Sequence, residues 1–159
     1  ISNFAKPGKQ CLHNLRYWNS EEYLGFGPGA HSYFGGRRFA YRRNTEDYIR
    51  NLEYPGSVSD ILSEDYAIKP SERLGEYVML RMRLTEGVDT GDFAAKFGVS
   101  FEKMFAKYLP MYLDNGFMKN KGRKYFFTPK GMFVSNYILS AMLDFDSDII
   151  KGVADGSDR

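Results

Sequence analysis

The sequence predicts an α+β fold, because strand signals and helix signals occupy different parts of the chain. Two extended runs, residues 30–34 and 37–42, flank Gly35-Gly36, and two consecutive glycines favour a two-residue hairpin because both can take positive φ. Apolar residues between positions 72 and 84 predict a helix that is enclosed on several sides. Further helix signals fill most of the chain from residue 90 to 143.

The first part of the chain carries weaker signals. Residues 1–22 contain the turn signal Pro7-Gly8 and no sustained period, whereas residues 23–27 form a short aromatic and aliphatic run that predicts a buried strand. Asn44 or Thr45 is expected to cap a helix over residues 46–52. Residues 56–70 have few apolar positions and are expected to be a linker.

The second part predicts a helix over 90–97 and a helix over 101–115, capped by Ser100 and ended by Gly116. A hairpin is expected from 117–119 and 124–128, and a last helix from 132 to 143. Helix, turn, helix, hairpin and helix is the order of a winged helix. The acidic residues 146–159 are expected to form a flexible tail.

Composition sets the broad class of the protein. The chain has 159 residues, a net charge of +2 and one cysteine, which excludes a disulfide framework and favours a reducing compartment. No apolar run reaches the roughly 20 residues that span a bilayer, and no signal-peptide segment opens the chain. Because it begins with Ile1 rather than Met, we expect a fragment of a cytoplasmic protein.

Residues capable of chemistry gather between positions 11 and 36. This stretch holds both histidines, the only cysteine and the only tryptophan. Gly25, Gly27 and Gly29 would let the backbone approach a ligand closely, or would serve tight packing at the end of a strand. The sequence leaves those two interpretations open.

Several kinds of site are poorly supported. Cys11 and His13 lack a third group that would orient a base for nucleophilic catalysis, and one cysteine with two histidines falls short of the usual zinc set. A heme site is better supported by the residues of this stretch. Imidazole binds iron, and a porphyrin needs flat apolar walls and cations for its propionates. His13 with Tyr17 and Trp18, and with arginines nearby in the sequence, supplies these groups: Arg16, Arg37 and Arg38. The alternative to a heme ligand is that His13 is a histidine packed in the core.

The run His13-Asn14-Leu15-Arg16-Tyr17-Trp18 resembles the HNxxYW motif of the HemW-type heme chaperones. These are radical-SAM proteins related to the oxygen-independent coproporphyrinogen III oxidases. The flanking residues 1–8 and 23–32 agree with the same family, and the resemblance continues through 72–89 to Leu139. Residues 113–117 and 127–131 also resemble its C-terminal domain.

The resemblance implies that residues 1–55 are the last strands and hairpin of a radical-SAM barrel, and that residues 71–145 are a winged-helix-like C-terminal domain. The whole protein would bind a [4Fe–4S] cluster and S-adenosylmethionine through a barrel that precedes this sequence. Its role would be to bind heme and deliver it to a heme-accepting protein. Because the Cys-x-x-x-Cys-x-x-Cys motif is absent here, this fragment alone is expected to be inactive as an enzyme.

The same resemblance assigns residues to the site. His13 would be the heme-iron ligand, with Tyr17 and Trp18 beside the porphyrin. Gly25, Gly27, Gly29 and His31 would lie near the cofactor, although a structural role for His31 is the stronger expectation. Cys11 is either a second ligand or a buried thiol, and the buried thiol is favoured.

Two other functions remain. Radical oxidative decarboxylation of coproporphyrinogen III is the first alternative, but the HNxxYW motif favours the chaperone. A nucleic-acid-binding winged helix is the second. The helix expected at 101–115 is neutral, and its apolar residues look like core: Phe101, Met104, Phe105 and Tyr108. The basic hairpin at 117–131 is then a solvated surface, so nucleic acid is not the expected partner.

Overall fold

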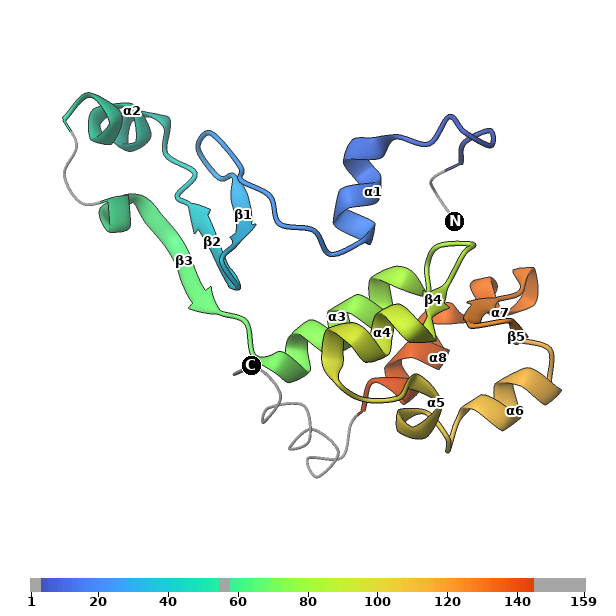
Figure 1. Cartoon of the computed structure of the whole chain (residues 1–159). Coiled ribbons are helices and arrows are strands. Elements are labelled where there is room, and N and C mark those ends of the chain that lie inside the picture. The colour runs from blue at the N-terminus through green and yellow to red at the C-terminus, as the bar shows by residue number, and fades with distance from the viewer. Residues whose placement is uncertain (1–3, 55–57, 145–159) are drawn as a thin grey trace. The chain divides into compact units, whose positions relative to one another are not determined.

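The computed structural model describes residues 4–54 and 58–144 and divides into two compact units (Figure 1). One unit is Glu21–Lys69, and the other combines the segment up to Ser20 with the segment from Pro70 onward. Helices and strands both occur, as the α+β prediction requires. The tail predicted at 146–159 lies outside the described residues.

The unit Glu21–Lys69 is built on an antiparallel sheet with the strand order β1-β2-β3. Strand β1 (His31–Phe34) and strand β2 (Arg37–Tyr41) form the predicted hairpin, and Gly35 and Gly36 between them have φ of +59° and +69°. Helix α2 (Thr45–Glu53) begins after Asn44, whose side chain accepts a hydrogen bond from the Asp47 N–H at 3.1 Å. A 3-10 turn, η1 (Val58–Ile61), leads into β3 (Leu62–Ala67).

Two predictions for this unit were wrong. Residues 23–27 are not a buried strand, because only Tyr23 pairs, in a single bridge with Tyr33, and Phe26 is 84% exposed. The expected linker at 56–70 contains β3, which pairs along β2. Strand β3 is at an edge and almost all its side chains are exposed, so it lacks the alternating apolar pattern that announces a half-buried strand.

The other unit is mainly helical. Its small sheet is antiparallel with the order β4-β6-β5, and residues 12–18, for which no period was found, form the helix α1. Its elements in chain order are α1 (Leu12–Trp18), α3 (Pro70–Arg81), β4 (Val88–Asp89), α4 (Thr90–Phe97), α5 (Phe101–Met104), α6 (Leu109–Asp114), β5 (Met118–Lys121), β6 (Lys124–Phe127), α7 (Pro129–Phe133) and α8 (Ser135–Met142).

Local signals account for several of these elements, and three helices differ from prediction. The helix predicted over 72–84 spans Pro70–Arg81. Helix α4 has the predicted bounds and ends at Gly98, which has φ of +71°. The expected helix 101–115 is instead two short helices, α5 and α6. Pro110 lies in the first turn of α6, where its missing N–H costs nothing, but it could not donate within one continuous helix. The helix expected at 132–143 begins earlier, at Pro129, and is interrupted at Val134.

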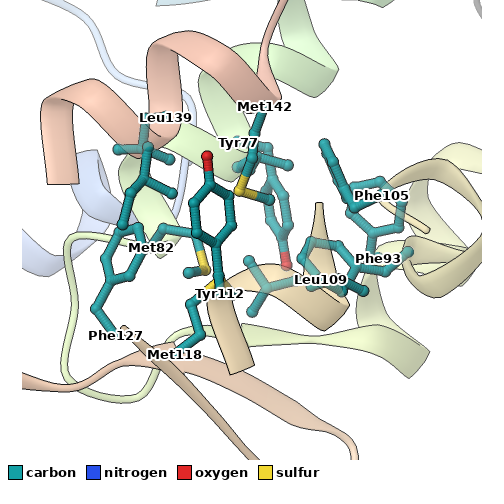
Figure 2. Packing of buried hydrophobic residues seen from close by; sticks show 14 of the residues in the cluster. Tyr77, Met82, Phe93, Phe105, Leu109, Tyr112, Met118, Phe127, Leu139 and Met142 are labelled. Atoms are coloured by element: carbon teal, nitrogen blue, oxygen red, sulfur yellow. The ribbon is translucent and has the colours of Figure 1, made fainter. Parts of the chain in front are cut away.

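An aromatic core holds the helical unit together (Figure 2). Phe93 of α4 is fully buried, and its ring meets that of Phe101 edge-on with centroids 5.4 Å apart. Tyr77, Phe97 and Phe105 pack around the same ring. Phe101 and Phe105 are therefore core residues, as predicted, and Met104 and Tyr108 are partly buried against the same core. Among the described residues, no helix is long and apolar enough to cross a membrane.

Candidate functional site

Helix α1 presents His13 and Tyr17 together on one side. They are one helical turn apart, both are exposed, and their rings meet edge-on with centroids 5.0 Å apart and an interplanar angle of 84°. The helix begins after Cys11 and contains no buried residue. An imidazole placed this way is available to a ligand from solvent.

The other side of α1 faces protein. Leu15, Trp18 and Asn19 are partly buried, and they follow the i, i+3, i+4 spacing of one helical face. The helix lies against α3 within the same unit. The structure thus brings His13 and Tyr17 together and places Trp18 toward the packed face.

Asn19 anchors the end of this helix. It is the C-cap residue of α1, and its side-chain oxygen accepts a hydrogen bond from Nη1 of Arg81, the last residue of α3. Sequence reasoning missed both residues, because 62 positions separate them and neither belongs to a recognisable local pattern. The sequence did contain a signal for the packed face of α1, since Leu15 and Trp18 are apolar and three residues apart.

Cys11 corrects a prediction. The favoured expectation was a buried thiol, but Cys11 is exposed and free. It occupies the N-cap position of α1 without a side-chain capping hydrogen bond, so nothing local buries its sulfur. Of the arginines considered for propionates, Arg37 pairs with Asp65, its Nη2 lying 2.8 Å from Oδ1.

The glycines and His31 belong to the other unit. Gly25 donates its N–H to the Ser32 hydroxyl at 2.9 Å, and a Cβ at this position would lie 2.3 Å from the His31 carbonyl oxygen. Gly25 therefore serves a close approach between two backbone segments. Gly27 and Gly29 have φ of +103° and +73°, and His31 opens β1 with its side chain exposed.

The chain's own residues do not fit an iron–sulfur cluster. Such a cluster is held by several thiolates, and the sequence has one cysteine. In residues 4–54 and 58–144, no three side chains of His, Cys, Asp or Glu gather where they could hold a metal ion. A single exposed imidazole, by contrast, could supply one ligand nitrogen to a heme iron.

Comparison with known proteins finds similar chains. Residues 68–134 match the HemN C-terminal domain family. The heme chaperone HemW of Bacillus subtilis is 34% identical over 143 residues, which are 90% of this chain and 37% of that protein. The chain is a relative of the HemW-type heme chaperones. HemW of Synechocystis is 33% identical over 89% of the chain, and HemW of Escherichia coli is 31% identical over 89%.

A solved structure supports the fold. Coproporphyrinogen III oxidase (HemN) from Escherichia coli, described as a radical SAM enzyme, matches 89% of this chain with a TM-score of 0.62 and 16% identity. The match covers 35% of the HemN chain. The chain likewise spans well under half of the HemW proteins it resembles, for example 37% of that from B. subtilis and 38% of that from Synechocystis.

Proposed function

We propose that this chain is part of a heme chaperone, which binds heme through His13 and delivers it to a heme-accepting protein. The observation that carries the proposal is the exposed pair of His13 and Tyr17 on a helix whose opposite face is packed. The relationship to HemW proteins, which are named heme chaperones, supports the same function.

The residues of α1 suit reversible binding. The neutral imidazole of His13 would supply a lone pair to the heme iron. Tyr17 lies edge-on beside that ring and would border the porphyrin, whereas Trp18 lies toward the packed face. Because His13 is at the surface, an acceptor protein could reach the iron without unfolding the helix.

We propose further that the sheet β1-β2-β3 is the last part of a radical-SAM barrel and that the helical unit is a winged-helix-like domain. The three-stranded sheet with its β5–β6 hairpin, preceded by α3 to α6, supports the second assignment. In the full-length cytoplasmic protein, a [4Fe–4S] cluster and S-adenosylmethionine would be held by residues outside this chain. Gly25, Gly27, Gly29 and His31 would lie near that cofactor region.

Coproporphyrinogen III oxidation remains the alternative for the full-length protein. The likeness to HemN supports it only at the level of fold, because the identity is 16%. The HemW relatives share roughly twice that identity, and this difference favours the chaperone.

Heme titration followed in the Soret region tests the proposal. We expect the chain to give a saturable band that weakens or shifts in the His13→Ala variant. His31→Ala is the matched control, because it removes the only other imidazole, also exposed, and should leave the band as it is. A band that depends on His31 and not on His13 would remove His13 from the site. No saturable band in full-length protein with an intact cluster would move the assignment to coproporphyrinogen oxidation, to be checked by product analysis.

A further inference from the structure

We infer that the contact between Arg81 and Asn19 is a clamp that sets the orientation of α1 and so positions His13 for heme. Arg81 and Asn19 are positioning residues in this account, since neither side chain is placed on the heme itself. The inference rests on the proposed function for its consequence, although the clamp itself can be tested without heme.

Helix α1 has little to hold it in place on its own. It has seven residues, no side-chain hydrogen bond at its N-cap and no acidic residue in its first turn. Helices this short are unstable in isolation, because nucleation costs more than a few hydrogen bonds return. None of its residues is fully buried, so the position of the helix depends on a small number of specific contacts.

Arg81 supplies such a contact from a helix that is anchored in the core. It ends α3, a helix whose Leu74, Tyr77 and Val78 are core residues. Its side chain is 15% exposed, its Nη1 donates to Asn19 Oδ1, and its Nη2 lies 4.0 Å from Glu86 Oε2. The guanidinium thus has one hydrogen-bond acceptor, Asn19, and lies at ion-pair distance from Glu86, and its mostly buried position limits its direction.

The local structure is held at an energetic cost. Within the described part of the chain, Arg81 Nε and the Ser20 hydroxyl are buried and have no hydrogen-bond partner. Ser20, which follows Asn19, has φ of +56°, a region that residues with a side chain seldom adopt. Unpaired buried groups and strained backbone persist where the surroundings impose them, often at functional sites. Here they coincide with the end of the helix that carries His13.

The clamp also determines which side of α1 faces outward. Asn19 comes six positions after His13, and at about 100° per residue this places the two residues about 120° apart around the helix axis. Holding Asn19 against α3 therefore directs His13 and Tyr17 away from it, as their exposure shows. A helix free to rotate would present the pair to solvent only part of the time.

Trp18 allows the clamp to be measured directly. It is the only tryptophan, it is partly buried, and it directly precedes Asn19. We expect Asn19→Ala in the full 159-residue chain to shift the emission of Trp18 to longer wavelength and to raise its quenching by acrylamide about twofold, because the indole becomes accessible. Asn19→Asp should keep the wild-type emission, since a carboxylate can also accept from Arg81. Asn14→Ala is the control for loss of an exposed asparagine from the same helix.

Heme titration of the same variants tests the consequence. We expect Asn19→Ala to weaken heme binding about tenfold, as for loss of a hydrogen bond to a charged group, and Asn19→Asp to restore it. In Arg81→Gln, adding Asn19→Ala should cause no further loss. A cooperative melt by circular dichroism must persist in each variant.

The outcomes separate the two proposals. Unchanged Trp18 emission in Asn19→Ala overturns the clamp, and changed emission with unchanged heme affinity overturns its role in positioning His13. Heme binding that does not depend on His13 overturns the proposed function, while the emission data still decide whether the clamp exists.

Discussion

Gly131, in α7, has no room for a side chain. A Cβ there would lie 1.9 Å from the Phe117 carbonyl oxygen, and that backbone cannot move away without disturbing the end of the β5–β6 hairpin. At Gly91, in α4, the nearest atom is Nη1 of Arg123 at 2.8 Å, the far end of a flexible and exposed side chain. The two glycines therefore differ in what surrounds them.

We predict that Gly131→Ala lowers the free energy of unfolding by about 1–3 kcal/mol, the usual range for overpacking. Gly91→Ala should leave it unchanged or raise it by about 0.5–1 kcal/mol, because alanine is the better helix former. Urea unfolding of the two variants beside the wild type is the measurement. Equal losses in both variants would contradict the role of the Phe117 carbonyl.

Single residues were predictable where their effect is local. Asn44 and Ser100 cap helices as expected, each by accepting a backbone N–H three residues on. The exposure of Cys11 and the pairing of Asn19 with Arg81 were not predictable, because they depend on the neighbours that folding brings together. The same limit applies to His13, for which the sequence could not choose between core packing and ligand binding.

Helix α4 depends on the residue before it. Asp89 accepts hydrogen bonds from the N–H groups of Gly91 and Asp92 at 2.9 and 3.2 Å, and Arg123 lies 3.4 Å away. Burial by itself would raise the pKa of Asp89, but these donors and the Arg123 charge outweigh it and hold the pKa below the usual 3.8. The ionised form is therefore favoured in the folded chain.

The lowered pKa of Asp89 makes the stability of the folded chain depend on pH. Since the folded pKa is the lower one, the unfolded chain takes up the proton first, and the stabilisation is complete above about pH 4 and lost as pH falls through the folded pKa. We expect Asp89→Asn to reduce the urea midpoint at pH 7, with the difference from wild type disappearing at strongly acidic pH. Asp114→Asn, at an exposed position at the end of α6, is the control. A difference that is independent of pH would contradict the assignment.

Elements were predictable where one signal dominated. Gly35-Gly36 specified the hairpin, and Gly98 marked the end of α4. Strand β3 was not predicted because its polar side chains are exposed at a sheet edge. The interruption before α6 was not predicted because apolar residues continue through it. Strand β3 is specified by its pairing with β2, whereas Pro110 was a local signal for the interruption that the prediction did not use.

At the scale of the whole molecule, the two units differ in how many apolar residues they bury. The large aromatic and aliphatic core lies between Leu74 and Met142, whereas the buried apolar residues described in Glu21–Lys69 are Ala40, Ile61 and Ile68. A sheet with so little buried apolar surface has little to resist opening.

We therefore predict that hydrogen exchange followed by mass spectrometry will be complete in peptides from β1, β2 and β3 while α3, α4 and α8 are still protected. The expected ratio of rates is at least about 100-fold, corresponding to roughly 3 kcal/mol of difference in opening free energy. Equal protection in both units would show that the sheet is stabilised by something other than its own core.

The exposed thiol of Cys11 has a practical consequence for chemical modification. It is the only sulfhydryl in the chain and lies two residues before His13. If the thiol borders the approach to the imidazole, alkylation with a bulky maleimide will weaken heme binding, whereas iodoacetamide, which adds little bulk, will not. A graded set of such reagents would distinguish steric access to the site from coordination within it, using the natural sequence throughout.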